Sequence, residues 1–280
     1  MEKGKRETDN VLAYLRENFP GFENAKIASY PTELYVRETR HVKAEYMLPM
    51  SDVWTHRDHW DSIGFGGYPV DVQATSVRDY GYVLSNPVQY AIPFRSLVPL
   101  EVENVAMATR SAGYSSLAAG SSRIIPTGMA TGDAAGVAAA IAIREGITFR
   151  ELAYNEALIE ELRSTLKAQG AKVDYFDIPY PYQGEWIDES IQLLIDYGLV
   201  VGGYTNDLNV TAELSVLHFA NILSNGLFRS NMDAYNTYNA GIRQVDSWEN
   251  VRELVFTRDE IAAYILSAFN GVENGTWEQA

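Results

Sequence analysis

The stretch that decides the fold is residues 104–142, NVAMATRSAGYSSLAAGSSRIIPTGMATGDAAGVAAAIA. A continuous apolar run overlaps its start at 102–109, and such a run predicts a strand buried on both faces. A loop rich in Ser and Gly follows over 111–122, and small residues then continue from about Thr127 to Arg144. This order predicts a strand, a loop and a long helix that pack together.

Within the predicted helix, Gly128, Gly132, Gly136 and Ala140 recur every four residues and form one bare stripe. Each interior glycine costs a helix about 1 kcal/mol relative to alanine. The stripe therefore indicates that a strand or a ligand approaches the backbone closely, and valine at Gly132 is expected to overfill that contact. The helix start at Thr127 offers unpaired N–H groups and a positive dipole end, which favour an anion. The spacing alone also fits a tightly packed unit without a ligand.

The composition indicates a globular protein with one large or two modest domains. The chain has 280 residues, of which 46% are hydrophobic. Its net charge of −15 makes nucleic acid and anionic membrane surfaces unexpected partners. The absence of cysteine excludes disulfides, thiolate metal sites and a cysteinyl–flavin bond. The longest apolar stretch, around 134–143, is shorter than the roughly 20 residues of a membrane span. We expect no membrane span, and the compartment stays open.

Two regions of different character are predicted around this stretch. Short strand-like runs predict a mostly antiparallel sheet at 33–37, 42–48, 68–74, 80–84 and 90–94. Amphipathic patterns predict further helices at 11–19, 151–168, 186–197, 211–225 and 257–269. A segment rich in Pro and aromatic residues at 174–185 predicts a linker. We therefore expect an α/β domain over 1–174 and a small helical domain over 175–280.

The deciding stretch resembles the terminal segment of the FAD-dependent oxidoreductase family with a glutathione-reductase-like cofactor fold. Three upstream blocks resemble the segment between that family's cofactor motifs: LYVRETRHVKAEYMLPMSDV (34–53), WDSIGFGGYPVDVQ (60–73) and YAIPFRSLVP (90–99). The resemblance covers about residues 9–170. It implies a partial FAD-binding Rossmann-like domain, a mostly antiparallel substrate-domain sheet, and FAD as cofactor.

The resemblance also implies which residues lie beside FAD. Thr127, Gly128 and Met129 would face the pyrimidine edge of the isoalloxazine ring, where N–H groups and the helix dipole stabilise the negative charge of reduced flavin. Arginine forms bidentate contacts with phosphate, and hydroxyls either donate or accept. The residues expected to border the ribityl chain and pyrophosphate are Arg110, Ser111, Ser122 and Arg123.

One part of the cofactor fold has no counterpart in this sequence. Dinucleotide-binding folds open with a strand, a Gly-x-Gly-x-x-Gly turn and a helix that hold the pyrophosphate. The nearest approach, Gly64-Phe65-Gly66-Gly67, lacks both the spacing and the following helix. We therefore expect the cofactor site to need an upstream dinucleotide-binding segment, either on a separate polypeptide or lost from a truncated or split gene product.

Two polar clusters outside the flavin segment are candidates for chemistry. Arg37, Arg40 and His41 could bind a carboxylate or sugar acid, or transfer a proton near the flavin. The alternative is a surface cluster of ion pairs with neighbouring glutamates. The second cluster, HRDHWD at 56–61, suggests a metal site, but two histidines three apart lack a third fixed ligand. We predict no metal.

The C-terminal segment resembles a surface-layer homology motif over 186–223, with a fragment of a second one at 256–269. Gly198 suits a left-handed helix end, and Thr257 with Glu260 fits a capping box. Motifs of that family bind cell-wall polysaccharide and usually occur in several copies. With about one copy and a fragment, we expect a structural appendage or docking surface rather than a wall anchor.

These inferences lead to one functional hypothesis and two alternatives. The hypothesis is an FAD-dependent oxidoreductase component that transfers hydride from a small polar substrate to flavin. One alternative is a cell-wall glycan-binding module with an inert α/β part. The other is a non-catalytic remnant of a split flavoenzyme.

Overall fold

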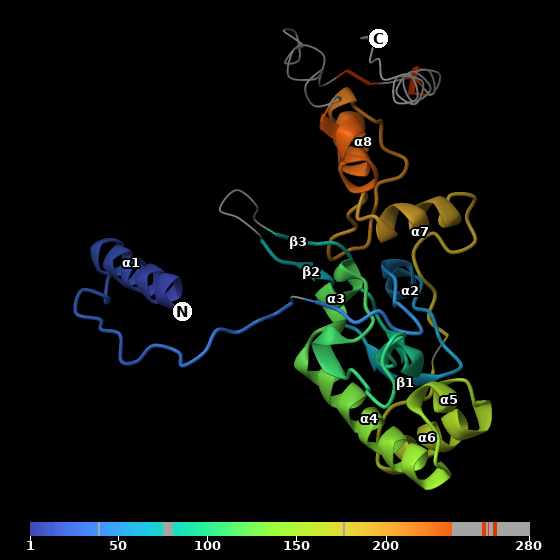
Figure 1. Ribbon diagram of the computed structural model, residues 1–280. Coiled ribbons are helices and arrows are strands. Elements are labelled where there is room, and N and C mark those ends of the chain that lie inside the picture. Colours follow the sequence, from blue (N-terminus) through green and yellow to red (C-terminus); the bar gives the residue numbers. More distant parts are fainter. Residues whose placement is uncertain are drawn as a thin grey trace. The chain divides into compact units, whose positions relative to one another are not determined.

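Two units make up the chain, Met1–Thr39 and Arg40–Ala280 (Figure 1). The computed structural model describes residues 1–38, 40–74, 81–175, 177–236, 254–255, 257 and 260–261. The predicted division at residue 174 falls inside the second unit. The division at residue 174 rests on a change in sequence composition. It stays a prediction that the two parts are distinct domains.

The first unit consists of helix α1 (Glu2–Asn18) and an irregular tail. The helix begins well before the predicted start at residue 11, and none of its residues is buried. Arg16 binds the tail by donating from Nε to the carbonyl of Ala25 at 2.9 Å. The strand predicted at 33–37 is wrong, because these residues form no ladder and their side chains are exposed.

The second unit contains two small antiparallel sheets. Strand β1 (Ser62–Gly66) pairs with β4 (Tyr90–Pro93), and β2 (Asp71–Val72) pairs with β3 (Tyr82–Val83). The antiparallel pairing is confirmed, although the strands are shorter than predicted. The segment 42–48 makes only isolated bridges, from Ala44 to Pro99 and from Leu48 to Tyr114. Among the residues that the structure describes, no parallel sheet forms, so the Rossmann-like layer stays a prediction about the complete cofactor site.

Four helices follow the sheets, and side-chain caps start three of them. The four helices are α3 (Ser116–Ser122), α4 (Ile125–Glu145), α5 (Phe149–Ala153) and α6 (Glu156–Ala168). The Ser115 side chain caps α3, a Thr148–Glu151 capping box starts α5, and Asn155 caps α6. Asn155 also divides the single helix predicted at 151–168 into α5 and α6. Helix α4 confirms the long helix expected from Thr127 to Arg144.

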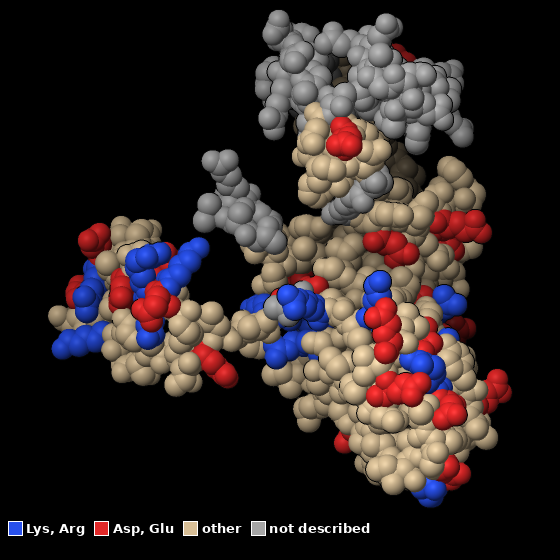
Figure 2. Space-filling view, in the orientation of Figure 1, with Lys and Arg blue, Asp and Glu red and all other residues tan. Residues whose placement is uncertain are grey.

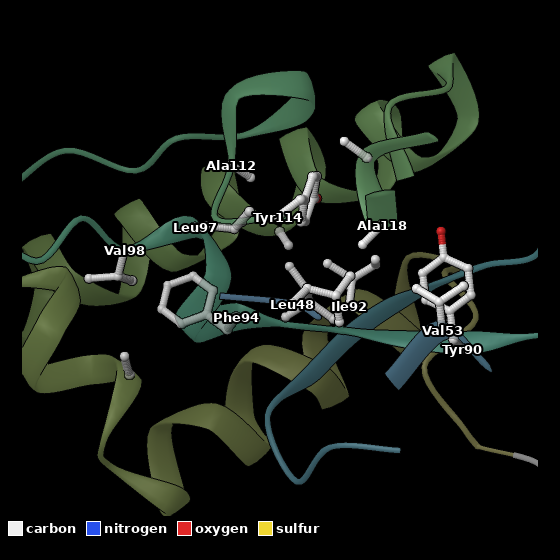
Figure 3. Close-up of a cluster of buried hydrophobic side chains, with 14 of the residues drawn as sticks. Leu48, Val53, Tyr90, Ile92, Phe94, Leu97, Val98, Ala112, Tyr114 and Ala118 are labelled. Atoms are coloured by element: carbon white, nitrogen blue, oxygen red, sulfur yellow. The ribbon is translucent and has the colours of Figure 1, made fainter. Parts of the chain in front are cut away.

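The core lies between α4, the β1–β4 pair and the segment that contains α2 (Met50–Trp54). Figure 3 shows Leu48, Ile92 and Phe94 pointing into this cluster together with Tyr114, and each of them is buried. Helix α4 contributes small buried residues, Ala134 and Ala138, so its backbone packs close to β1.

The strand predicted at 102–109 is wrong. These residues are irregular, with Val102 51% exposed, and the segment ends in the 3-10 turn η2 (Thr109–Ser111). Met107 N–H donates to the carbonyl of Leu97 at 2.7 Å, just beyond the 3-10 turn η1 (Phe94–Leu97), but no ladder follows. A strand needs a neighbour that pairs with it, and the described part of this chain provides none for this run.

The segment beyond residue 174 packs against the earlier part of the unit. Helix α7 (Asp188–Asp196) contacts α2, and Asp196 Oδ1 accepts a hydrogen bond from the N–H of Ser51 at 2.6 Å. Gly202 N–H donates to the carbonyl of Leu84 at 2.8 Å. Gly198, with φ of 61°, ends α7 in the left-handed conformation, as predicted.

Helix α8 (Val216–Ser230) corresponds to the pattern at 211–225, and its N-cap Ser215 accepts from His218 N–H. The predicted helix 257–269 lies mostly outside the described residues. Its capping box is confirmed, because Thr257 N–H donates to Glu260 Oε2 at 2.8 Å and Glu260 N–H donates to Thr257 Oγ1 at 3.3 Å.

In the described part of the chain, no single helix has the length and apolar character needed to cross a membrane. Helices α3 and α4 pass that test only when taken together, and they are bent by 94° at their junction.

Candidate functional site

The start of α4 presents backbone N–H groups without a side-chain cap. Its N-cap is Ile124, which has no side chain that accepts a hydrogen bond, and Pro126 occupies the first turn. The first intrahelical bond there runs from Gly128 N–H to the Ile124 carbonyl at 3.0 Å. Ile125 is 71% exposed, so solvent reaches this first turn. The helix start therefore keeps its capacity to bind an anionic group.

Thr109 lies directly on this helix start in a strained backbone conformation. Its φ is 75°, in the left-handed region that a β-branched residue rarely adopts. Thr109 N–H donates to Thr131 Oγ1 at 3.1 Å, and a Cβ on Gly128 would stand 3.4 Å from Thr109 Cγ2. The close approach predicted at Gly128 is thus observed, and the contact fixes η2 on the first turns of α4.

Two of the predicted residues lie in η2, and a third lies beside it. Arg110 and Ser111 are half-buried, and the Ser111 carbonyl accepts from Val42 N–H at 2.9 Å. The His41 ring lies one residue further, with Nδ1 3.2 Å from the carbonyl of Ala112. The structure therefore brings His41 next to the predicted cofactor residues of η2.

The other two residues of the predicted substrate cluster are placed differently. Arg40 is adjacent to His41 and exposed, whereas Arg37 belongs to the first unit. Arg37 lies 5.7 Å from the ring centre of Tyr35 within that unit. The two units are described separately, so the cluster of Arg37, Arg40 and His41 stays a prediction.

Ser122 and Arg123 lie in the turn between α3 and α4, with side chains engaged by the protein. Ser122 Oγ donates to the carbonyl of Ala118 at 3.1 Å. The Arg123 guanidinium is 7% exposed and uses Nη2 to contact the Asp71 carbonyl at 3.4 Å and its carboxylate at 3.3 Å. The Arg123 contacts hold the turn against β2, whereas the Ser122 bond lies within α3, and a role for either side chain at FAD stays a prediction.

The three residues predicted at the helix start do not share one face. Thr127 is 3% exposed and Gly128 is half-buried under Thr109, whereas Met129 is 70% exposed. Of these three residues, only Thr127 has a backbone N–H that precedes the first intrahelical bond, which is donated by Gly128 N–H, so a ligand at this helix start would meet the N–H groups of Ile125 and Thr127.

The bare stripe of α4 is covered only at its first glycine. Among the residues that the structure describes, nothing lies within 4 Å of a Cβ built on Gly132 or Gly136. The expectation of close contact along the whole stripe, and of overfilling by valine at Gly132, is therefore wrong for this chain. Figure 2 shows that the surface over α4 is mostly without charge.

A buried polar network around α2 was not found from the sequence. Asp52 is 2% exposed and accepts hydrogen bonds from the Tyr46 hydroxyl, from Arg57 Nη1 at 3.1 Å and from His59 Nε2 at 2.9 Å. Burial opposes ionisation of Asp52, but the bonds from His59 and Tyr46 outweigh it and hold its pKa below the ordinary value. In the run 56–61, His56 accepts from Val88 N–H and His59 bonds Asp52, and no cluster of three or more His, Cys, Asp or Glu that could hold a metal occurs among the residues with described positions.

A cavity lies at the opposite end of α4, among the described residues. It has a volume of about 570 Å³ and its lining includes Asn104, Ala139, Ile143 and Phe149. None of the residues that line it carries an ionisable group, so this cavity offers no acid or base for catalysis.

A comparison with protein families decides the identity of the larger part of the chain. Residues 1–166 match the family described as FAD dependent oxidoreductase. The chain belongs to this family. FAD is the cofactor that membership of the FAD-dependent oxidoreductases implies. Comparisons with curated proteins and with solved structures found no match. The likeness of the later segment to a surface-layer homology motif gained no support from these comparisons.

Proposed function

We propose that this FAD-dependent oxidoreductase forms the isoalloxazine side of a flavin site and transfers hydride from a small polar substrate to FAD. The observation that carries the proposal is the uncapped start of α4 with the strained Thr109 fixed on it. Strained residues persist only where the surrounding structure holds them, and they cluster at ligand sites.

The residues at this helix start fit the group that the family implies. FAD supplies the hydride-accepting ring, which gains negative charge on reduction. The N–H groups in the first turn and the positive end of a 21-residue helix stabilise a negative charge without reorganisation. The exposed first turn leaves room for a ring to approach the backbone, since Ile125 and Met129 point outward.

Side chains beside the helix start have distinct proposed roles. Arg110 and Ser111 border the phosphate and ribityl groups, because guanidinium and hydroxyl groups bind such oxygens. Arg123 holds the turn that enters α4 and adds positive charge near the phosphates, and Ser122, at the end of α3, adds a hydroxyl there. His41, next to η2, is the proposed acid or base for the substrate, with Arg40 beside it as a carboxylate ligand and Arg37 as a further candidate.

A companion dinucleotide-binding segment completes the site in this proposal. The sequence has no Gly-x-Gly-x-x-Gly turn after a strand, and that turn normally holds the pyrophosphate. The outer face of α4 is also open and largely apolar: its exposed residues include Ile125, Met129, Gly132, Gly136, Ala140 and Ile143. Both features support a cofactor site that this chain forms only in part.

Flavin binding tests the proposal directly. The purified chain should be colourless or bind flavin weakly. Co-expression with a dinucleotide-binding segment from an adjacent gene should yield a yellow complex that keeps its flavin absorbance through gel filtration. Tight, stoichiometric FAD on the isolated chain would contradict the partial site. A complex without flavin would contradict the oxidoreductase function.

A further inference from the structure

His56 joins three separate segments of the second unit. It follows α2 with φ of 52°, and its side chain is buried at 2% exposure. Val88 N–H, from the β3–β4 connection, donates to Nε2 at 3.1 Å. Nδ1 lies 3.4 Å from the carbonyl of Ile178 in the linker, and the Tyr175 hydroxyl donates to the His56 carbonyl at 2.5 Å. We call His56, Val88, Tyr175 and Ile178 the junction.

The contacts of the ring define one protonation state. A backbone N–H always donates, so Nε2 must accept from Val88 and carry no proton. The ring proton is then on Nδ1, which donates to the Ile178 carbonyl. A second proton would place Nε2–H against Val88 N–H, donor against donor, in a site closed to water. The neutral ring fits the junction and the imidazolium does not.

The groups around the junction do not stabilise a charged ring enough to offset burial. Burial lowers the pKa of His56, and the backbone at Ile178 and Pro179 opposes this only in part. On its own segment, Arg57 contacts Asp52, and Asp58 accepts from His59 N–H. From the linker, Asp177 acts with Asp58 on the Tyr175 hydroxyl, whose pKa is raised mainly by burial.

Three further elements, α7, β4 and α3, pack against α2. Helix α7 presents Asp196, whose carboxylate accepts from Ser51 N–H at the start of α2. Strand β4 presents the buried phenol of Tyr90, which donates to Ser121 Oγ on α3 at 2.7 Å, and α3 has no acidic or basic side chain.

The β3–β4 connection is also bound by the segment that follows the linker. Asn206 Oδ1 accepts from Asn86 N–H at 2.7 Å and from Ser85 Oγ at 3.1 Å, and Asn206 Nδ2 donates to the Asn86 carbonyl at 2.8 Å. Residues 85–88 are therefore held by His56 on one side and by Asn206 on the other. The Ser85 carbonyl also accepts from Val70 N–H at 2.7 Å, and Asn86 Nδ2 donates to the Tyr204 carbonyl at 3.2 Å. Loss of the His56 contacts would therefore free the Val88 end of this connection while residues 85–86 stay attached.

We propose that His56 is a pH-sensitive latch: protonation of its ring breaks the contact with Val88 and releases the linker 174–185 from the β3–β4 connection. The latch does not involve the flavin site. Its experiment can therefore fail without contradicting the proposed function, and the proposed function can fail without contradicting the latch. It operates as the pH falls below the ordinary histidine value of 6.5, because the folded state disfavours the charged ring.

Hydrogen exchange of the full chain at about pH 7.5 and about pH 5, corrected for intrinsic rates, tests the latch. In the wild type, exchange at Val88 and across 177–182 should rise by about fivefold or more at the lower pH. His56→Gln, whose amide oxygen can accept from Val88 and does not titrate, should abolish the rise. His59→Gln, the matched control at a second buried histidine, should retain it. No rise in the wild type, or an equal rise in His56→Gln, would overturn the proposal.

Ring nitrogen NMR of the wild type provides a test that does not depend on a variant. His56 should carry its proton on Nδ1 at about pH 7.5 and titrate below the ordinary value of 6.5. The Val88 amide signal should move along the same titration curve. A proton on Nε2 at neutral pH, or a Val88 amide signal whose chemical shift does not change as His56 titrates, would refute the latch.

Discussion

At the scale of single residues, Asp52 is the buried carboxylate on which Tyr46, Arg57 and His59 converge. Asp52→Asn removes the charge and replaces one acceptor oxygen by an amide NH2, which then faces the donors of the three partners. The substitution should therefore lower the free energy of unfolding by about 2–4 kcal/mol at neutral pH. Urea denaturation measures this change. Asp133→Asn, at an exposed aspartate, is the control and should change stability by less than about 0.5 kcal/mol. Equal stability of the two variants would show that the network contributes nothing.

Asp52 should also make the stability of the protein depend on pH. The pKa of Asp52 is held below its ordinary value of 3.8, so its stabilising contribution is complete above that value. The contribution is lost as the pH falls through the lower folded value. The difference in unfolding free energy between wild type and Asp52→Asn should therefore shrink below about pH 4. A difference that stays constant down to about pH 2 would contradict this assignment.

Thr109 stores strain beside the helix start. Glycine adopts a φ of 75° without steric cost, so Thr109→Gly should be more stable than Thr109→Ala by about 1 kcal/mol in thermal or urea unfolding. Both variants keep the N–H that bonds Thr131, which makes alanine the matched control. If alanine were the more stable of the two, the left-handed conformation would not be a source of strain.

Sequence patterns found some of these residues and missed others. Arg110, Ser111 and Thr127 were identified through a resemblance, and the structure brings their segments together at one helix start. Asp52 and its partners carry no periodic signal, because Tyr46 and His59 meet it through chain reversal rather than regular spacing. The polar run 56–61 suggested a metal, whereas His56 and His59 make separate contacts with the protein.

At the scale of elements, the glycine stripe of α4 is open at Gly132 and Gly136, and substitution there can show whether this face is exposed. Gly132 has open space where a Cβ would stand, so Gly132→Ala should raise the stability of the isolated chain by up to about 1 kcal/mol. The same change should weaken association with a companion dinucleotide-binding segment by adding bulk to the proposed contact face. Gly128→Ala, where the methyl meets Thr109, should give no such gain. Unfolding curves and pull-down with the companion measure the two effects, and a loss of stability on Gly132→Ala would show the face to be covered.

The helices were predicted better than the strands for a physical reason. A helix closes its hydrogen bonds within one segment, so the patterns at 127–144 and 186–197 sufficed to locate α4 and α7. A strand needs a partner from elsewhere in the chain. The run 102–109 has the composition of a central strand, yet the described residues give it no neighbour. Strand β1 was missed because its sequence SIGFG is short and contains two glycines, which weaken the strand signal.

At the scale of the whole molecule, the described residues from 177 to 207 pack against the earlier part of the second unit. Helix α7 packs on α2, and Asn206 binds the β3–β4 connection. We therefore expect the full chain not to sediment with isolated cell walls. Saturable pelleting that free glycan competes away would contradict this expectation and favour the wall-binding alternative.

Arg123 and Arg144 on the second unit differ in how far they are exposed. On the face in Figure 2, basic and acidic residues are interspersed, and Arg144 forms an exposed pair with Glu161 at 2.6 Å. Arg123 also pairs with an acid, the Asp71 carboxylate at 3.3 Å, but it is buried near the start of α4 and close to the proposed phosphate path. A buried cation acts on an anion with less screening than an exposed one. The two arginines thus form a matched pair at opposite ends of one helix.

In the yellow complex of this chain with its companion segment, Arg123→Ala should weaken FAD binding by about 1–3 kcal/mol. That corresponds to a rise in Kd of roughly 5- to 150-fold, measured by fluorescence quenching of FAD. Arg144→Ala should leave the Kd unchanged, since it removes an exposed charge at the far end of α4. Circular dichroism checks that both variants stay folded, because loss of the Asp71 contact also loosens the turn before α4. An unchanged Kd in a folded Arg123→Ala complex would remove Arg123 from the cofactor site and leave the backbone of α4 and the η2 residues as its protein contacts.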